Sequence, residues 1–447
     1  MDVRPTLPFP NELCGAILEY LSQPDLKSFS CCSKTCRELA VPFLYRSIRF
    51  NAVPASSLAE GGALFSRLRY VRKLRYVLPR ADLTPRVFQA DGGTGAMRTG
   101  AYLMKTFTPF TDFLTASLAF PLTWLQLNFS GEEHLEINLF HTMFSRLSQS
   151  RVHTTLRRLT LSYRVDFLLP LCTQYMILGP SENPYETLMT RHPGVLGPPL
   201  LPGTLCEAPG GRGGMPVPPP NLTEASLCLR KEPVPQPFYY YFFAACPTLR
   251  KFTINAARLY PPNSPAPLYH SSLLSFTTVT HLHVSVQPYP PADELTWVSQ
   301  HFPCVEDLTV ELHKFEYCAQ GSNASHLQAA HKDIRRMRAL RKATIPWPRL
   351  RKPMYGNVPR YSRLYVRKDP GEDARHLSCA ELECWVTCWR DGGAQLLRTV
   401  VFDGYDPCAR RDVDKTLLAT CEVGSGEAGY AFSWTGDDAK ESTTAAN

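Results

Sequence analysis

The sequence predicts an α/β protein in which a short helical module precedes an irregular solenoid of strands and helices. Two observations support this fold class. Near the N-terminus, apolar residues recur at helical spacing. Much of the remaining chain repeats a Leu-x-x-Leu-x-Leu pattern, which alternates as a half-buried strand does. With 447 residues, the chain is long enough for two or three domains or for one long repeat array.

The first predicted helix falls within residues 9–21. Pro10 suits a first helical position, where its missing N–H is not needed. The apolar stripe of this helix consists of Leu13, Ile17 and Leu21, with Leu18 beside it. A second helix is predicted to begin at Pro24 and to end at Pro42. Two helices this small cannot close a core alone, so they either cap the following domain or dock on another protein.

The residue types and their spacing resemble the F-box, whose pattern runs roughly Leu-Pro-x-Glu-Leu, Ile-Leu-x-Tyr-Leu, Asp-Leu and Val-Cys-Lys-x-Trp-Arg-x-Leu-Ala. The matching residues are Phe9, Pro10, Glu12, Leu13, Ile17, Leu18, Tyr20, Leu21, Asp25, Leu26, Lys34, Arg37, Leu39 and Ala40. The sequence departs from the pattern at Phe9, at Cys32 and Ser33, and at Cys36, which replaces the large aromatic residue. Residues 42–48 resemble the extension that follows the F-box in many fungal proteins.

The resemblance implies that residues 9–50 bind a Skp-family adaptor and, through it, a cullin–RING ligase. In the family, an apolar face of the helices packs against the C-terminal helices of the adaptor. Carried over to this chain, the adaptor-binding residues are Phe9, Pro10, Leu13, Ile17, Leu18, Leu21, Leu26 and Phe29. The chain is then the substrate-recognition adaptor of a Skp–cullin–F-box (SCF) ubiquitin ligase and is not itself an enzyme.

Residues 64–423 carry the repeating pattern. Its eight clear copies are Val71-Leu74-Tyr76, Leu122-Leu125-Leu127, Leu156-Leu159-Leu161, Leu249-Phe252-Ile254, Val279-Leu282-Val284, Val305-Leu308-Val310, Leu340-Ala343-Ile345 and Leu397-Val400-Phe402. Pro247 and Pro303 occupy equivalent places in two copies, with another copy between them, which gives a period of about 28 residues. This period and pattern resemble leucine-rich repeats, although the spacing is irregular. Weaker copies lie at Leu227-x-Leu229 and Leu364-x-Val366.

Predicted helices precede several of these strands, so the order helix, turn, strand recurs. They are Phe140–Leu147, Gln236–Ala245, Asp293–His301, Ser325–Met337 and a helix that Ser378-x-x-Glu381 opens. Stacked units of this kind would form an extended surface for a protein substrate, whereas an ordinary α/β domain is the alternative. The substrate-binding residues are unknown, although Tyr239–Tyr241 and Arg335–Arg341 carry residue types that are common in binding hot spots.

Three segments are predicted to lack regular structure. Residues 193–220 are dominated by Pro and Gly and form a predicted disordered insertion. Residues 86–100 are predicted to form a second loop, and residues 424–447 a disordered tail.

Composition argues against several classes of partner. The net charge of +8 comes from dispersed Lys and Arg residues, so no nucleic acid is expected. No stretch approaches the ~18 apolar residues of a membrane span, and no signal-peptide core is present, so a cytoplasmic or nuclear protein is expected. The 15 cysteines include no Cys-x-x-Cys pair, so the cluster of His376, Cys379, Cys384 and Cys388 is not expected to bind a metal.

No catalytic residue or cofactor is predicted. Gly424-x-Gly426-x-x-Gly429 matches the dinucleotide-binding string, but too little chain follows for the rest of that motif. His281 and His283 alternate along a predicted strand and are expected to share one face. The alternative function is a repeat-based interaction scaffold outside a ubiquitin ligase. Exposure of Leu13, Ile17, Leu18 and Leu21 would distinguish the two functions, because docking requires these residues at the surface.

Overall fold

The computed structural model divides the chain into two compact units. Unit 1 comprises residues 1–225 with 245–248, and unit 2 comprises residues 226–244 with 249–447. The residues that the structure describes are 10–50, 65–77, 110, 113–114, 121–129, 140, 143–164, 216–230, 237–256, 275–286, 297–312, 317–318, 334–346, 349–351, 374–376, 379–405, 416–426 and 429–435. Phe9, the 86–100 loop, most of the 193–220 segment and Leu364-x-Val366 lie outside these residues.

Unit 1 begins with three helices, α1 (Asn11–Tyr20), α2 (Gln23–Cys32) and α3 (Lys34–Leu44). The single helix predicted between Pro24 and Pro42 is therefore wrong, since the structure has two helices there. Ser33 separates them because its backbone is extended and its hydroxyl accepts a hydrogen bond of 3.0 Å from the N–H of Cys36. This is an N-cap, which starts a new helix.

Helix α3 continues through Pro42 to Leu44, although the sequence predicted that Pro42 ends it. A proline inside a helix removes the N–H that would bond to the carbonyl four residues earlier. Here that residue is Glu38, which is exposed, so water can replace the missing donor. Helices α1 and α2 both pack against α3. Their shared interior consists of Cys14, Leu18, Leu26, Cys36, Ala40 and Val41.

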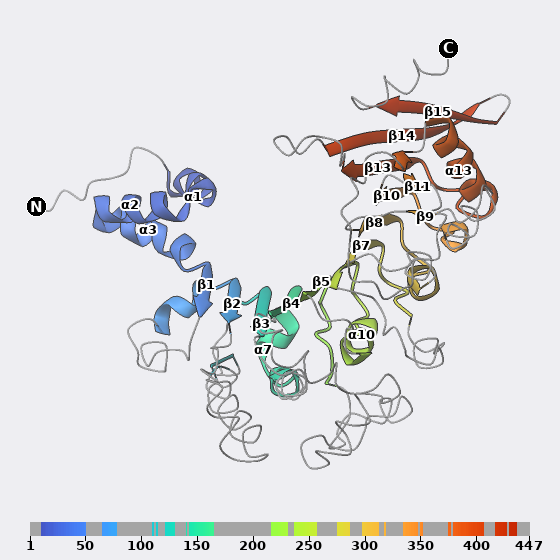
Figure 1. The fold of residues 1–447 in the computed structure, drawn as a ribbon. Helices are drawn as coiled ribbons and strands as arrows, with labels where there is room; N and C mark the ends of the chain where they lie inside the picture. The colour runs from blue at the N-terminus through green and yellow to red at the C-terminus, as the bar shows by residue number, and fades with distance from the viewer. Residues whose placement is uncertain are drawn as a thin grey trace, which may run out of the picture. The chain divides into compact units, whose positions relative to one another are not determined.

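Four parallel strands follow in chain order, β1 (Ser47–Phe50), β2 (Lys73–Val77), β3 (Trp124–Phe129) and β4 (Arg158–Arg164) (Figure 1). A 3₁₀ helix, η2 (Phe65–Tyr70), precedes β2, and helix α7 (Arg151–Thr155) precedes β4. Residues 143–147 are also helical, as predicted. The recurring order of helix, turn and strand is thus present in this unit.

The turns before the strands are joined by a repeated backbone contact. The carbonyl of Arg72 accepts hydrogen bonds from the N–H groups of Thr123 and Trp124, at 2.9 and 3.0 Å. The carbonyl of Thr123 accepts in the same way from Arg157 and Arg158, at 2.9 Å each. Each turn therefore satisfies polar groups of the next, which fixes the parallel register where the strands begin.

Unit 2 contains five parallel strands in chain order, β6 (Lys251–Ala256), β7 (His281–Val286), β8 (Asp307–Leu312), β10 (Lys342–Pro346) and β13 (Thr399–Tyr405). Two antiparallel strands, β14 (Thr416–Gly426) and β15 (Gly429–Thr435), extend this sheet from β13. A smaller sheet contains β9 (Tyr317–Cys318), β11 (Arg349–Arg351) and β12 (Ala374–His376). Among the described residues of this unit, helices are α10 (Pro237–Ala244), η4 (Ile334–Arg336) and α13 (Cys379–Asp391), and residues 297–301 are also helical, within the helix predicted at Asp293–His301. The residues of strand β5 (Glu224–Arg230) fall in both units.

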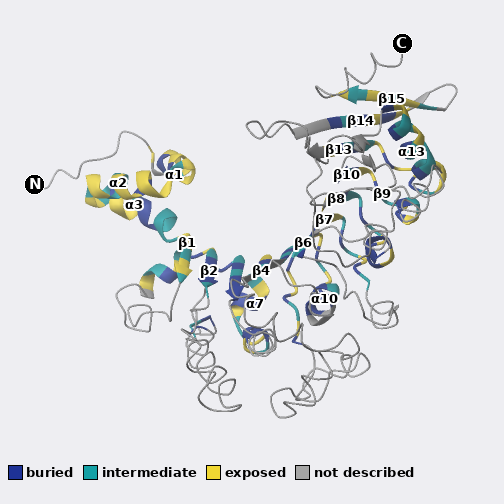
Figure 2. Ribbon diagram, viewed as in Figure 1, coloured by how far each residue is buried: buried dark blue, intermediate teal, exposed yellow. Residues whose placement is uncertain are grey.

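All eight strands predicted from clear copies of the pattern are confirmed. The second apolar position of each copy pairs with that of its neighbour, so Leu74 aligns with Leu125 and Leu125 with Leu159 in unit 1. In unit 2 the aligned residues are Phe252, Leu282, Leu308, Ala343 and Val400. Every one of these side chains is buried. Figure 2 marks buried residues along the strands in dark blue. In each unit, one face of these parallel strands is therefore continuous core, and the alternate side chains lie on the other face.

Aromatic residues fill the core of unit 2. The rings of Phe276 and Phe302 are stacked with centroids 4.4 Å apart, and Phe252 lies 5.3 Å from Phe276. Tyr239 and Tyr240 of α10 are buried as well. The suggestion that they form a binding hot spot is therefore wrong, because their apolar rings are part of the interior.

Parts of two segments that were predicted to be disordered have a defined structure. Residues 216–220 are ordered, with Pro216 and Pro219 buried and the Val217 carbonyl 3.1 Å from His153 Nε2. The prediction of a disordered tail is wrong for residues 424–426 and 429–435, because they belong to the paired strands β14 and β15. Gly424, Gly426 and Gly429 lie in or beside this hairpin, not in a dinucleotide-binding loop.

Candidate functional site

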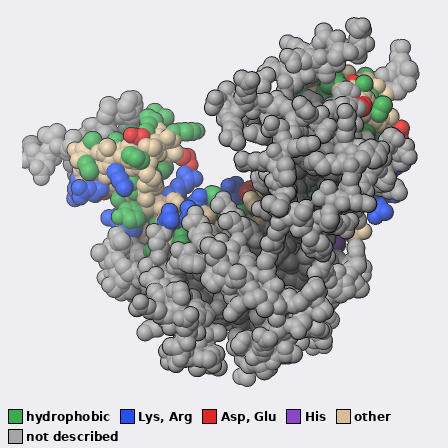
Figure 3. Space-filling view, in the orientation of Figure 1, with side chains coloured by type: hydrophobic (Ala, Val, Ile, Leu, Met, Phe, Trp, Pro, Cys, Tyr) green, Lys and Arg blue, Asp and Glu red, His purple; other side chains and the backbone are tan. Residues whose placement is uncertain are grey.

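The outer face of α1 carries three of the five large hydrophobic residues that are exposed in the described part of the chain. Leu13 and Ile17 are 54% and 52% exposed, and Tyr20 is 90% exposed. These residues are four and three positions apart, so they lie on one side of the helix. Figure 3 shows hydrophobic side chains at the surface of the N-terminal helices. We call Leu13, Ile17 and Tyr20 the α1 surface.

The opposite face of α1 is buried in the helical module. Leu18 is 2% exposed, and Leu26 of α2 is 3% exposed. Both were predicted to bind the adaptor directly, and this placement needs correction, because neither side chain reaches the surface. They hold α1 and α2 on α3 and so support the α1 surface from behind.

The other predicted adaptor-binding residues are divided between surface and interior. Pro10 is exposed, and Leu21 and Phe29 are half-buried. Tyr20 was matched to the F-box pattern but left out of the predicted surface. Its spacing from Leu13 and Ile17 on one helical stripe would have identified it.

An ion pair fixes α1 to the chain that follows α3. Arg46 Nη1 lies 2.6 Å from Glu19 Oε1, and both side chains are about half exposed. A pair this exposed contributes at most about 1 kcal/mol to folding. Its effect is to restrain the end of α1 that carries Ile17 and Tyr20.

The α1 surface suits binding rather than catalysis. Three neighbouring large apolar side chains in water favour an interface that covers them. Full burial of each such side chain contributes about 1.5–3 kcal/mol, against which the cost of association must be set. A partner with a complementary apolar groove would therefore gain most from these three residues.

The metal cluster that the sequence raised as a question falls among the described residues. No group of three His, Cys, Asp or Glu side chains there is placed to hold a metal. Cys379 is buried and Cys384 is exposed, so these two point to different environments on α13. His281 and His283 share the outer face of β7 as predicted, and His283 Nε2 lies 3.3 Å from Glu311 Oε2. None of the described helices is both long and apolar enough to span a membrane.

Comparison with known proteins identifies the helical module. Residues 7–41 match the model of the F-box domain. No curated protein matches the chain. F-box domains generally bind Skp-family adaptors in cullin–RING ligases. The chain therefore carries an F-box domain at residues 7–41. This domain supports the interpretation of the chain as an F-box protein and, at the level of that family, a role as a substrate adaptor of SCF ligases.

Proposed function

We propose that this chain recruits a protein substrate to an SCF ubiquitin ligase. The F-box helices dock on a Skp-family adaptor, and the strand-bearing body that follows them binds the substrate. Residues 42–48 run from the end of α3 into β1. Their sequence resembles the extension of many fungal F-box proteins, and this resemblance is the basis for proposing the fungal type.

The observation that carries the proposal is the exposure of Leu13 and Ile17 within a matched F-box domain. Had the following strands covered these residues, the helices would only cap the chain. Instead the α1 surface is open, while Leu18 and Leu26 give it a rigid base. Because the apolar area is already held in place, docking would require little further ordering of the chain.

A leucine-rich-repeat-like body accounts for substrate binding in this proposal. Its support is the order of parallel strands in each unit and the aligned apolar positions of the repeating pattern. A repeated parallel sheet has one face packed in the core and leaves the other for a partner. The polar side chains that alternate with the buried ones form that second face.

The chain contributes proximity rather than chemistry. In this proposal ubiquitin transfer takes place on the partner proteins of the cullin–RING assembly, and the chain needs no catalytic residue or cofactor. Holding the substrate beside the charged conjugating enzyme raises its effective concentration there. The expected place of action is the cytoplasm, the nucleus or both.

The proposal is tested by co-purification of the full-length chain with a Skp-family adaptor, using wild type and Ile17→Asp. A charged side chain on the α1 surface should prevent the adaptor from covering it. Val217→Asp is the matched control, since Val217 is 50% exposed and Ile17 52%, and Val217 lies outside the F-box. Because both positions are exposed, neither variant should lose its fold.

The expected result is that wild type and Val217→Asp retain the adaptor and Ile17→Asp loses it. If folded wild-type chain emerges alone, the ligase proposal fails. The chain would then be an interaction scaffold outside a ubiquitin ligase. Equal retention by all three would show that the α1 surface is not the docking site.

A further inference from the structure

The open face of the first parallel strands carries an aligned row of side chains. Lys73 of β2, Trp124 of β3 and Arg158 of β4 are register partners on adjacent strands. They alternate with buried Leu74, Leu125 and Leu159, so they lie on the face opposite the core.

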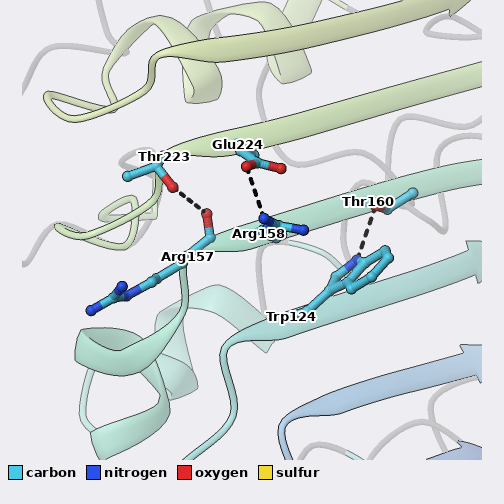
Figure 4. Close-up of polar contacts among 6 residues, drawn as sticks. All are labelled: Trp124, Arg157, Arg158, Thr160, Thr223 and Glu224. Carbon is cyan, nitrogen blue, oxygen red and sulfur yellow. Dashed lines mark hydrogen bonds and ion pairs between the residues drawn. The ribbon is translucent and has the colours of Figure 1, made fainter. Parts of the chain in front are cut away.

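Trp124 holds the two cations of this row together. Lys73 Nζ lies 3.4 Å from the centroid of the Trp124 ring, and Arg158 Cζ lies 5.9 Å from it. Trp124 Nε1 donates a hydrogen bond of 3.3 Å to Thr160 Oγ1, which fixes the ring on the sheet (Figure 4). The ring therefore places an ammonium and a guanidinium group near one another. The attraction of both cations to its π-electrons offsets the repulsion between them.

A third cation lies on the same face. Arg75 follows Lys73 by two positions on β2 and therefore points to the same side. The side-chain amide of Asn128 is oriented so that its oxygen faces donors and its nitrogen faces acceptors. Asn128 Oδ1 then accepts hydrogen bonds from Arg75 Nη2 and Nε, at 3.0 and 3.1 Å. Asn128 is itself buried, so Arg75 is anchored by a fixed acceptor that carries no negative charge.

Among the described residues, one carboxylate is paired with these three cations. It belongs to Glu224 of β5, whose Oε1 lies 3.1 Å from Arg158 Nη2. Burial lowers the pKa of Lys73, and the charges of Arg75 and Arg158 lower it further. The cations thus repel one another, and an added anion would relieve that repulsion.

We propose that Lys73 and Arg158, held at Trp124, together with Arg75 on the same face, bind an acidic segment of a protein partner. We call these four residues the basic strand face. This inference rests on the proposed function and deepens it, because the acidic segment belongs to the substrate.

The spacing of the cations suits carboxylates on an extended peptide. Lys73 and Arg158 are separated by two strand spacings, about 10 Å, and Lys73 and Arg75 by about 7 Å along one strand. Alternate residues of an extended peptide are also about 7 Å apart. Acidic side chains on such a peptide can therefore reach several of the cations, and Arg offers them paired N–H donors.

The same geometry disfavours a single-stranded nucleic acid. Binding of that kind relies on aromatic rings that stack with bases. Here Lys73 already lies over the Trp124 ring, and the indole N–H is bonded to Thr160. Glu224 also places negative charge at one end of the row, where a continuous phosphate backbone would run.

The exposed face of unit 2 has a different charge pattern. Glu311 of β8 pairs with His283, and Asp403 of β13 has a pKa raised by burial and by the charge of Glu311. Carboxylates near one another repel an acidic ligand as well. The basic strand face in unit 1 is therefore the surface that acidic segments should prefer.

The test measures binding of a labelled polyglutamate peptide to the full-length chain by fluorescence anisotropy. Polyglutamine and oligothymidine of similar length serve as comparison probes. One variant is a double variant that combines Lys73→Gln with Arg158→Gln. The other, Arg157→Gln, is the matched control. Arg157 is adjacent in sequence and exposed, and its side chain points away from Trp124 in Figure 4.

Polyglutamate should bind wild type, its binding should weaken with added salt, and polyglutamine should not bind. The double variant should bind polyglutamate about tenfold more weakly, because each of the two lost exposed ion pairs should weaken binding roughly threefold. Arg157→Gln should bind as wild type does. Absence of polyglutamate binding, or equal weakening by Arg157→Gln, overturns the inference. Tighter binding of oligothymidine with the same dependence on Arg158 overturns it in favour of a nucleic acid.

Adaptor co-purification with the same variants separates this inference from the proposed function. If the double variant retains the adaptor but no chain binds polyglutamate, only the acidic-segment inference fails. If Ile17→Asp and wild type both lack the adaptor but bind polyglutamate, only the ligase proposal fails.

Discussion

Trp434 Nε1 donates a hydrogen bond of 2.7 Å to Glu383 Oε1, which joins strand β15 to helix α13. The indole ring also lies over Phe402 of β13, with centroids 5.8 Å apart. One side chain thus connects the last hairpin both to the helix and to the parallel part of the sheet.

Replacing Trp434 by Phe should lower the stability of unit 2 by about 1 kcal/mol. The variant keeps an aromatic ring but removes the donor, which leaves Glu383 without this partner. Urea unfolding followed by far-ultraviolet circular dichroism would measure the loss. Ser433→Ala, at an exposed position of the same strand, should leave the unfolding midpoint in place. An unchanged midpoint for Trp434→Phe would mean that the hydrogen bond does not hold β15 on α13.

Alkaline pH should weaken unit 2 through Cys421. This thiol is fully buried, and burial together with the nearby Glu383 raises its pKa from 9.0 to about 12. Because the folded chain retains a proton that the unfolded chain releases, the stability is present below pH 9 and is lost as the pH rises from about 9 to about 12. The loss is at most about 1.4 kcal/mol per pH unit.

Comparison of Cys421→Ala with wild type between about pH 8 and pH 10 measures this dependence. The variant loses some packing at every pH, but its urea midpoint should fall less steeply as the pH rises. Cys384→Ala removes an exposed thiol and should keep the wild-type slope. Equal slopes in all three chains would remove Cys421 as the cause.

The repeating pattern predicted the strands well because it contains two independent pieces of local information. In Val279-Leu282-Val284, the last two residues alternate with polar ones, as in a strand with one buried face. The first residue is buried in the turn before the strand. A motif that describes both the turn and the strand is therefore specific, even without a regular repeat length.

Features that depend on distant contacts could not be predicted in this way. The β14–β15 hairpin contains Gly424, Gly426 and Gly429, which usually interrupt regular structure. Its order comes partly from Trp434 meeting Glu383, about fifty positions earlier in the chain. Local composition contains no information about that contact.

The candidate docking surface was predicted only in part for a related reason. Helix α1 has apolar residues on both faces, so Leu13 and Leu18 look equivalent in a periodicity argument. Packing against α3 decides that Leu18 is interior and Leu13 exposed. The basic strand face was missed because Lys73, Trp124 and Arg158 become neighbours only through the register of three strands.

Ser33→Ala should lower the stability of the helical module by about 1 kcal/mol. The change removes the hydroxyl that accepts the Cys36 N–H at the start of α3. Ser30→Ala is the control, since the Ser30 hydroxyl only donates to the Lys27 carbonyl within α2. Thermal unfolding monitored at the helical circular dichroism band would separate the two variants. If Ser30→Ala costs as much as Ser33→Ala, the break between α2 and α3 does not depend on the cap.

Leu282→Ala should destabilise unit 2 by about 2–5 kcal/mol, because it empties space in a core that cannot fully close. Leu282 is buried between its register partners Phe252 and Leu308. His283→Ala, the next residue, should change stability by less than about 1 kcal/mol, since it loses one exposed pair with Glu311. Urea unfolding of the two variants therefore tests the register directly. A slip of one residue would exchange the two faces of β7 and reverse the order of the two effects.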